Sequence, residues 1–181
     1  MYSKTHYMEI TLKKIYTNEK FSEETNCFKA DIYLNGKKVG YAENDGRGGN
    51  TTYYGIEHHW SEDIKRMEEY CKTLPPIVYT KEKHGMDFTI DMTLEHHIDN
   101  IISDYLNEKA EKQLAKNFDK GICYGSTYSY STITFNVGKK KITITEMLKT
   151  TNGTQKLIDT CNEKIKEGKK ILNTNLPFLT K

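Results

Sequence analysis

The sequence predicts an α+β fold in which antiparallel hairpins and sheets pack against three helices. Three observations support this class. Apolar and polar residues alternate over several short segments, apolar residues recur at helical spacing over longer ones, and Asn35-Gly36 separates two of the alternating segments. An Asn-Gly pair in that position is a strong hairpin signal, because a type I′ turn needs two residues that tolerate a positive φ.

The first strands are expected near the N-terminus. Met8, Ile10 and Leu12 alternate with polar residues, which is typical of a half-buried strand. The hairpin is expected over residues 27–42, and residues 52–56 are expected to form a further strand. These segments together predict a small antiparallel sheet. The hairpin residues expected to face inward are Phe28, Ala30, Ile32 and Leu34.

Three helices are predicted, over about residues 61–74, 93–119 and 154–172. Ser61 is a good N-cap for the first helix, which ends before Pro75-Pro76. The buried stripe of the third helix is expected to contain Leu157, Ile158, Cys161, Ile165, Gly168 and Leu172.

Further strands are predicted outside the first sheet. Residues 77–79 and 88–90 have the composition of short edge strands. A second hairpin is expected after Ile122, with its turn at residues 138–140. Residues 173–181 form a surface tail unless their apolar side chains dock on the protein. The residues of the second hairpin expected to face inward are Ile133, Phe135, Val137, Ile142 and Ile144.

The chain of 181 residues has the length of a single domain, and residues 1–181 are interpreted as one. A second interpretation stays open. In it, residues 1–75 and 121–181 are two small sub-units, each made of hairpins and a helix, and the long helix 93–119 joins them.

The net charge of +2 is unevenly distributed. Residues 1–60 carry no net charge, residues 61–120 carry −4 and residues 121–181 carry +6. A basic last third either presents a surface to an anionic partner or neutralises the acidic middle third by packing beside it. Of the 27 basic residues only Arg47 and Arg66 are arginines, and arginine is preferred for bidentate contacts with guanine. Sequence-specific binding of DNA is therefore disfavoured.

The cysteines indicate a reduced, cytoplasmic location. They are separated by tens of residues, and no charged-then-apolar leader precedes them. No apolar run approaches the roughly 20 residues that span a bilayer, so no membrane contact is expected. Cys27, Cys71 and Cys161 lie on apolar stripes and are expected to be small core residues.

No catalytic or metal-binding signature is present in the sequence. Cys123 and Ser126 are the candidates for a nucleophile, and no motif places a histidine beside them. The histidines at 58–59 and 96–97 are neighbours in sequence, and neighbours on a helix point about 100° apart, which is unsuited to sharing a metal ion. A weak carboxylate site near the second pair stays open, and its residues are Glu95 and Asp99.

The glycine-rich loop at residues 45–50 is one candidate binding site. Its glycines allow backbone amides to turn inward as a nest for an anion, with an arginine beside them. The loop lacks the spaced lysine and threonine of a phosphate loop, so a flexible connection between strands is the other interpretation. The residues proposed for binding are Asp45, Gly46, Arg47, Gly48 and Gly49.

The second candidate surface combines tyrosines and lysines in the last third of the chain. Tyrosine rings beside lysines can stack a base and neutralise a phosphate, or can form a protein interface. The other interpretation is that a helix covers this face. The residues of the surface are Tyr124, Tyr128, Tyr130, Lys139, Lys140 and Lys141.

Four segments of the N-terminal part carry a resemblance to a known class of proteins. They are Leu12-Lys-Lys-Ile15, Ser22-Glu-Glu-Thr-Asn-Cys-Phe-Lys-Ala-Asp31, Asn35-Gly-Lys-Lys-Val-Gly40 and Asn44-Asp-Gly-Arg-Gly-Gly49. Over roughly the first 75 residues the chain resembles small uncharacterised proteins carried by bacteriophages and mobile elements of Bacteroidota-like hosts. No active site of that class is available to carry over.

The resemblance implies an accessory protein of counter-defence or host-inhibition type, located in the cytoplasm of the bacterial host. Such a protein binds a host protein or a small anionic nucleotide. We expect no enzymatic activity and no cofactor. Non-specific nucleic-acid binding through the basic last third stays open, as do enzymatic chemistry through Cys123 or the histidines and assembly into a homo-oligomer.

Overall fold

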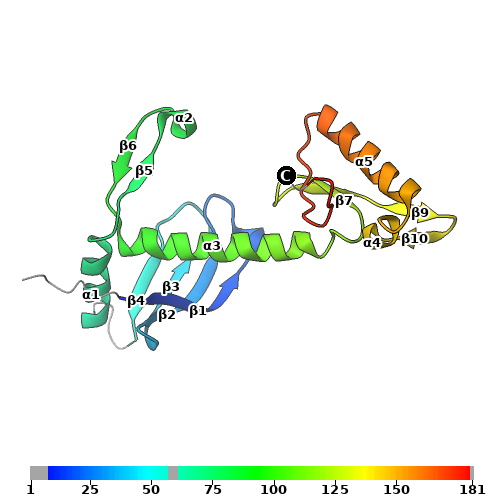
Figure 1. Cartoon of the computed structure of the whole chain (residues 1–181). Coiled ribbons are helices and arrows are strands. Elements are labelled where there is room, and N and C mark those ends of the chain that lie inside the picture. Colours follow the sequence, from blue (N-terminus) through cyan, green and yellow to red (C-terminus); the bar gives the residue numbers. More distant parts are fainter. Residues whose placement is uncertain (1–7, 57–60, 180–181) are drawn as a thin grey trace, which may run out of the picture. The chain divides into compact units, whose positions relative to one another are not determined.

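The structure is a computed structural model that describes residues 8–56 and 61–179 (Figure 1). It confirms the α+β class, because antiparallel strands pair in sheets and hairpins and helices pack against them. The chain divides into two compact units, Met1–Asp104 and Tyr105–Lys181, and the boundary lies within helix α3, Leu94–Ala115. Over the described ranges, none of the helices combines the length and the apolar character that a membrane crossing requires.

A four-stranded antiparallel sheet forms the centre of the N-terminal unit. Its strands lie in the order β1, β2, β3, β4, so each pairs with its neighbour in sequence. The hairpin predicted at Asn35-Gly36 is confirmed, with φ of 49° and 81° at these two residues. The strands are β1 Ile10–Thr17, β2 Phe28–Leu34, β3 Lys37–Asn44 and β4 Thr52–Gly55.

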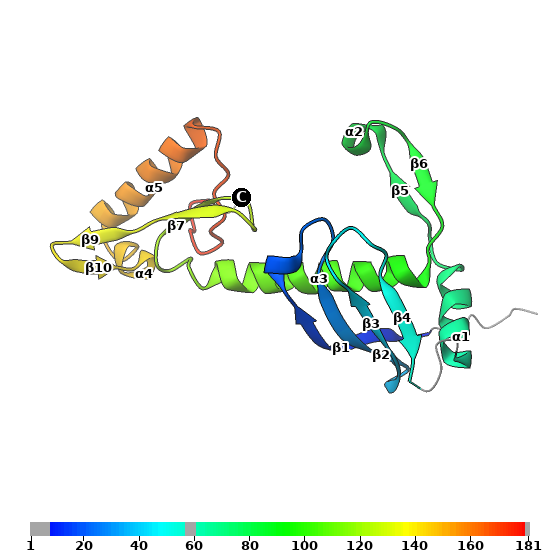
Figure 2. The ribbon, with the colours of Figure 1, turned by 180° about the vertical axis from the view of Figure 1, so that it is seen from behind.

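Helices cover one face of this sheet. Helix α3 crosses in front of the strands in Figure 1 and behind them in Figure 2. Its residues Leu94, Ile98 and Ile102 are fully buried against the sheet. Helix α1, Glu62–Cys71, contacts β3 and β4. We call the helix-covered face the inner face and the opposite one the outer face. As predicted, the buried residues of β2 on the inner face are Phe28, Ala30, Ile32 and Leu34.

The remaining elements of the N-terminal unit follow the sequence pattern closely. Helix α1 begins after Ser61, whose Oγ accepts a hydrogen bond from the Ile64 amide at 3.3 Å. The two short strands that were predicted are confirmed as the pair β5, Ile77–Tyr79, and β6, Phe88–Ile90. The single-turn helix α2, Lys81–His84, connects them.

The described part of the C-terminal unit contains the second half of α3, two β-hairpins in series and the helices α4 and α5. Strand β7 pairs with β8 and β9 pairs with β10, and Thr134 separates β8 from β9. The elements are β7 Ile122–Gly125, β8 Tyr130–Ile133, β9 Phe135–Val137, β10 Lys140–Ile142, α4 Ile144–Met147 and α5 Thr151–Lys166.

The core of this unit is a cluster between the hairpins and α5. Leu176 is fully buried in it and Phe178 and Leu179 pack against it, so the tail docks on the protein. Two side chains expected inside are exposed: Val137 at 66% and Ile165 at 49%. Val137 ends β9 at the hairpin turn, and Ile165 lies in the last turn of α5, so both extend beyond the packed region. The cluster contains Ile122, Phe135, Ile144, Met147, Leu157, Cys161 and Leu176.

The predicted helix boundaries in this part were inaccurate. Alternating isoleucines suggested a strand through residue 144, but helix α4 begins there. Thr143 and Glu146 form a capping box, in which Thr143 Oγ1 accepts from the Glu146 amide at 3.1 Å and Glu146 Oε2 accepts from the Thr143 amide at 2.8 Å. This Thr-x-x-Glu pattern is a helix-start signal in the sequence. Helix α5 begins earlier and ends earlier than predicted, before Gly168 with its φ of 74°.

The buried side chain of Asn173 fastens the tail to the rest of the C-terminal unit. Its Oδ1 accepts a hydrogen bond from the Cys123 amide at 2.6 Å. Its Nδ2 donates to the carbonyl oxygens of Phe118 and Gly121, each at 3.1 Å. One amide group therefore satisfies three backbone groups on segments about 50 residues earlier in the chain.

Replacing Asn173 with alanine is expected to lower the free energy of unfolding of this unit by about 2–3 kcal/mol, because buried backbone groups lose their partners. Urea denaturation followed by circular dichroism measures the change. Asn162→Ala removes an exposed amide from α5 and should change stability by less than about 0.5 kcal/mol. Equal stability of the two variants would contradict the role assigned to Asn173.

Candidate functional site

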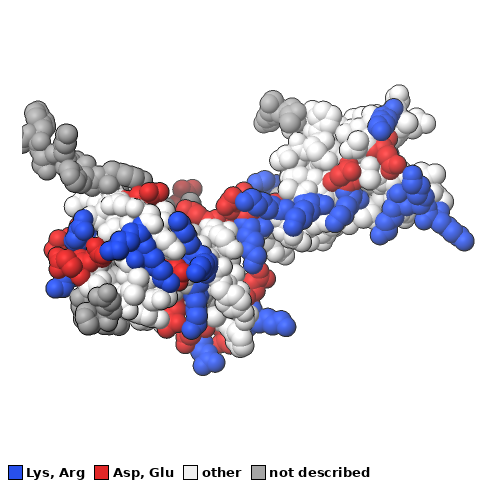
Figure 3. Space-filling model, turned by 90° about the horizontal axis from the view of Figure 1, so that it is seen from below, with Lys and Arg blue, Asp and Glu red and all other residues white. Residues whose placement is uncertain are grey.

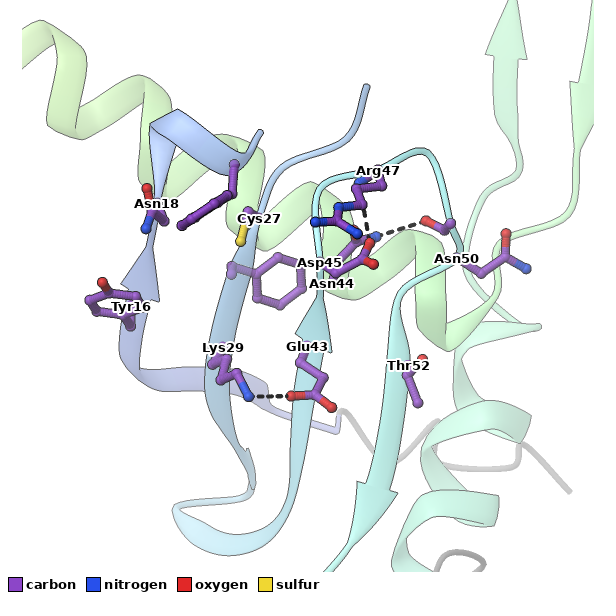
Figure 4. Close-up of a pocket in the computed structure, with 13 residues that line it drawn as sticks. Tyr16, Asn18, Cys27, Lys29, Glu43, Asn44, Asp45, Arg47, Asn50 and Thr52 are labelled. Atoms are coloured by element: carbon purple, nitrogen blue, oxygen red, sulfur yellow. Dashed lines mark hydrogen bonds and ion pairs between the residues drawn. The ribbon is translucent and has the colours of Figure 1, made fainter. Parts of the chain in front are cut away.

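A pocket of about 790 Å³ lies at one end of the outer face of the N-terminal sheet (Figure 4). One wall comes from the end of β1 and the β1–β2 connection, and the other from the β3–β4 loop. The glycine-rich loop singled out in the sequence therefore borders a cavity. The lining residues are Tyr16, Asn18, Phe21, Cys27, Phe28, Lys29, Glu43, Asn44, Asp45, Arg47, Gly49, Asn50 and Thr52.

One row of paired residues forms the floor of the pocket. Tyr16 pairs with Lys29, Lys29 with Glu43, and Glu43 with Thr52, so the row crosses all four strands. Lys29 Nζ lies 2.8 Å from Glu43 Oε2. The hydrogen bond with Glu43 and the charge of that carboxylate raise the pKa of Lys29. Lys29 is therefore a cation at neutral pH.

Two exposed aromatic rings and an arginine border the pocket. Tyr16 is 64% exposed and Phe21, on the short helix η1 Glu19–Phe21, is 55% exposed. Arg47 lies across the pocket from Tyr16 (Figure 4). Within the described part of the chain, no carboxylate pairs with the Arg47 guanidinium. The pocket thus contains both rings on which a ligand can stack and a cation, Arg47, that no described carboxylate neutralises.

Side chains accept hydrogen bonds from three of the backbone amides in the glycine-rich loop. The Gly46 amide donates to Asn44 Oδ1 at 2.8 Å, and the Arg47 amide donates to Asp45 Oδ1 at 3.1 Å. The Gly48 amide donates to Thr25 Oγ1 at 3.3 Å. The amides of residues 46, 47 and 48 are therefore already paired within the protein, which leaves the Arg47 side chain as the cationic group of this loop.

Gly46 instead joins the two walls of the pocket. Its carbonyl oxygen accepts hydrogen bonds from the amides of residues 23, 24 and 25, at 2.9, 3.0 and 3.3 Å. Its φ is +87°, and a Cβ at this position would lie 2.0 Å from the Phe21 carbonyl oxygen. Only glycine allows the loop to approach the β1–β2 connection this closely.

The carboxylates proposed as a weak metal site have another role. Glu95 Oε1 accepts from the Thr51 amide at 3.1 Å, and Asp99 Oδ1 accepts from Thr51 Oγ1 at 2.6 Å. They fasten the end of the β3–β4 loop to α3. Among the residues that the structure describes, no group of three or more potential metal ligands occurs. The histidine pair at 58–59 lies outside the described residues.

The structure distributes the second candidate surface over several places in the C-terminal unit. Tyr128 is in the β7–β8 loop, and its hydroxyl donates to Asn107 Oδ1. The hydroxyl of the half-buried Tyr130 accepts from Asn117 Nδ2 at 2.8 Å. Tyr124 alternates to the other side of the hairpin, where Lys164 Nζ lies 5.7 Å from its ring centroid.

The three lysines of that surface lie on the next hairpin. Lys139 is in the β9–β10 turn, Lys140 pairs with Glu146 at 3.2 Å, and Lys141 is exposed on β10. Residues 130–137 are extended between this turn and the β7–β8 loop, which corresponds to about 25 Å of chain. Figures 1 and 2 both show the loop and the turn at opposite ends. Tyr128 and these lysines therefore do not form one site.

The same unit carries three further lysines at the C-terminal end of α3. Lys109 and Lys112 lie on the helix, and Lys116 directly follows its last residue. Their spacings of three and four place them near one side of this end. All three are exposed, and Lys112 pairs with Glu108 at 2.6 Å. Figure 3 shows blue side chains that extend from the C-terminal half of α3 to the end of this unit that holds the β9–β10 hairpin.

The two candidate nucleophiles, Cys123 and Ser126, lie in different surroundings, and two of the expected core cysteines are buried. Cys123 is fully buried, with its Sγ 3.5 Å from Thr132 Oγ1. Burial raises the pKa of Cys71 and of Cys161 to about 11, so both thiols stay protonated at neutral pH. The exposed Ser126 hydroxyl donates to the Ser129 carbonyl oxygen at 3.4 Å within the β7–β8 loop.

The rings and the floor of the pocket were not predicted from the sequence. Tyr16 and Lys29 lie on strands that were predicted from their buried residues, and both are outward-facing residues of these strands. The signal was present: once Phe28 and Ala30 face inward, Lys29 faces outward. Phe21 follows Asn18, whose Oδ1 accepts from the Lys20 amide at 3.1 Å and caps the short helix.

Replacing Gly46 with alanine is expected to lower the free energy of unfolding by about 2–4 kcal/mol, because strain at positive φ adds to the clash with backbone. Gly36 has a similar φ and open space around it. Gly36→Ala therefore measures the backbone strain at positive φ alone, which is about 1–2 kcal/mol. Gly49→Ala, with open space and no positive φ, should be nearly neutral. Thermal unfolding compares the stability of the three variants. Equal destabilisation by Gly46→Ala and Gly36→Ala would show that the contact of Gly46 with the β1–β2 connection does not contribute to stability.

Comparison of the chain with protein-family models, with curated proteins and with solved structures gives no match. The geometry of the pocket and the charges of the two units are therefore the basis for inferring a function.

Proposed function

We propose that the protein is a non-enzymatic binding protein that holds a small anionic nucleotide in the pocket of its N-terminal unit. The observation that carries this proposal is that Tyr16 and Phe21, both exposed, line the same pocket as Arg47. A volume of about 790 Å³ is within the usual range for small-molecule sites.

The chemistry of the pocket matches the parts of a nucleotide. A base stacks on the exposed rings, because stacking tolerates any base. A phosphate pairs with Arg47, whose planar guanidinium forms two parallel hydrogen bonds with phosphate oxygens. Lys29 contributes less to binding of the phosphate, because the charge of Glu43 already compensates its own.

The resemblance of the N-terminal part to phage and mobile-element proteins supports a biological setting for this activity. In that setting the protein acts in the bacterial host cell as a counter-defence or host-inhibition factor. Binding without turnover sequesters a host nucleotide, and the absence of a motif for catalysis in the sequence agrees with such a role.

Arg47→Gln is expected to weaken nucleotide binding by roughly 10- to 100-fold, which corresponds to loss of charge-assisted hydrogen bonds with phosphate. Isothermal titration calorimetry with ribonucleoside mono- and triphosphates and cyclic mono- and dinucleotides measures the affinity. Arg66→Gln, which removes the other arginine of the chain from α1, is the matched control and should bind like the unmodified protein. Absence of heat with every nucleotide, or equal affinity of both variants, contradicts the proposal.

Non-specific nucleic-acid binding by the C-terminal unit is a second candidate function. Residues 105–181 contain 14 lysines against 7 acidic residues, a net charge of +7, whereas residues 1–104 contain 13 basic and 18 acidic residues, a net charge of −5. The three exposed lysines at the C-terminal end of α3, Lys109, Lys112 and Lys116, favour contact with phosphates. Lysine without arginine suits electrostatic contact that is independent of sequence.

Replacing Lys109, Lys112 and Lys116 together with glutamine is expected to weaken binding of a mixed-sequence duplex and to reduce the slope of log K against log salt by about 2–3, because three phosphate contacts are lost. Gel retardation between 50 and 200 mM salt measures both. The control changes Lys65, Lys72 and Lys81 to glutamine, which removes the same charge from the N-terminal unit. A salt slope that is unaltered by the first triple change excludes this surface.

A further inference from the structure

Two irregularities in strand pairing bring extra cations to the outer face of the N-terminal sheet. The first is in β1, where the register shifts between Lys13 and Tyr16 and Lys14 has a φ of 51°. Lys13 lies opposite Asp31 in the β1–β2 ladder, and Lys14 Nζ lies 3.6 Å from Asp31 Oδ2. Two consecutive lysines thus share one face, which regular alternation would not allow.

The second irregularity is in β3, at Val39, where the pairing with β2 shifts by one residue. Val39 is buried with the inner face. Lys38 and Tyr41, although three positions apart, therefore both lie on the outer face, where they pair with Tyr33 and Asp31. Bulges are frequent where a side chain has to be re-aimed for function.

The tyrosines of this face lie beside lysines. Lys13 Nζ is 4.3 Å from the centroid of the Tyr33 ring, and Lys38 Nζ is 4.0 Å from that of Tyr41. The rings of Tyr41 and Tyr54 are neighbours, with centroids 5.6 Å apart. Each ring is partly exposed. A ring with a cation at its edge or face can stack a base and neutralise the adjoining phosphate.

The charge of the outer face is positive. Within strands β1 to β4, the carboxylates on this face are Asp31 and Glu43, and both are already paired, with Lys38 at 2.8 Å and with Lys29 at 2.8 Å. The four lysines at positions 13, 14, 29 and 38 exceed these two carboxylates by two charges. Over the described residues, no ion pair engages Lys13.

The ring-bearing part of this face continues into the pocket. The floor of the pocket is the row that begins with Tyr16 and Lys29, and the next row contains Lys13, Tyr41 and Tyr54. Neighbouring rows on one face of a sheet are about 7 Å apart along a strand. Among the described residues of the N-terminal unit, no helix covers the outer face, which is turned toward the viewer in Figure 2.

We propose that the outer face binds single-stranded nucleic acid, with successive bases stacked on Tyr33 and on the Tyr41–Tyr54 pair and with one nucleotide in the pocket. Four-stranded antiparallel sheets with aromatic rings on an open face are a recurring platform for single strands. The part of this inference that concerns the pocket rests on the proposed nucleotide site, and the part that concerns the rings does not. A strand rather than a free nucleotide is then the preferred ligand.

Fluorescence anisotropy with labelled oligodeoxythymidylates of 4, 8 and 12 residues tests this proposal on the full chain. Affinity should rise with length and exceed that for thymidine monophosphate. Tyr33→Leu and Tyr41→Leu should each weaken binding of the 12-mer by roughly 5- to 100-fold, the effect of losing one stacked base. Tyr33→Phe keeps the ring and should restore binding. Tyr79→Leu, on the separate β5–β6 hairpin, is the control and should leave affinity unchanged.

Three outcomes would overturn the proposal. The 12-mer does not bind, or it binds and Tyr33→Leu and Tyr41→Leu leave its affinity unchanged. In the third outcome, these substitutions abolish self-association of the protein but not its binding of oligonucleotides. Thermal unfolding and sedimentation of each variant separate these outcomes from misfolding. The pocket is judged independently, because mononucleotide binding that depends on Arg47, without any gain from chain length, supports the proposed function and rejects the strand.

Discussion

The register of β2 is the constraint on which the rest of the N-terminal unit depends. Four alternate residues of this central strand are buried beneath α3, so a shift by one residue would expose all of them and bury charged groups. The same alternation turns Lys29, Asp31 and Tyr33 to the outer face. Hydrophobic burial on one side therefore determines which chemistry the other side presents. The neighbouring strands adapt to this register through bulges, at Lys14 and at Val39, and these bulges enrich the outer face in lysine and tyrosine.

Local patterns predicted much of the fold, because alternation, helix caps and the Asn35-Gly36 turn act over a few residues. They predicted the hairpin of β2 and β3, the strands β5 and β6 but not their pairing, and the start of α1 at Ser61. They failed at Val137, where tertiary context decides because the residue lies at a hairpin tip. They also predicted a strand where α4 begins, because the alternating isoleucines and the local capping box of Thr143 and Glu146 indicate different structures. The pocket was only partly predictable. The loop at 45–50 stands out by composition, but its contact with the β1–β2 connection requires a long-range packing of Gly46 that no short window contains.

The two units differ in the way in which they can hold an anion. In the N-terminal unit, whose net charge is −5, acidic residues outnumber the basic ones, but several cations lie beside aromatic rings and at a pocket, which favours ligands with both a ring and a phosphate. In the C-terminal unit, whose net charge is +7, lysines are numerous and exposed, and its tyrosines use their hydroxyls for contacts with Asn107 and Asn117. Stacking gives short-range selectivity, whereas excess charge gives long-range attraction that salt weakens.

The burial of three of the four cysteines has a practical consequence. Cys71, Cys123 and Cys161 are inaccessible in the folded protein, whereas Cys27 is partly exposed and lines the pocket. A maleimide dye added to the native chain should therefore attach at one place, without any mutation to remove competing thiols. Such a dye would lie beside the rings and Arg47, where displacement of water by an arriving molecule changes its emission. The natural sequence thus already contains a reporter for whatever enters this cavity.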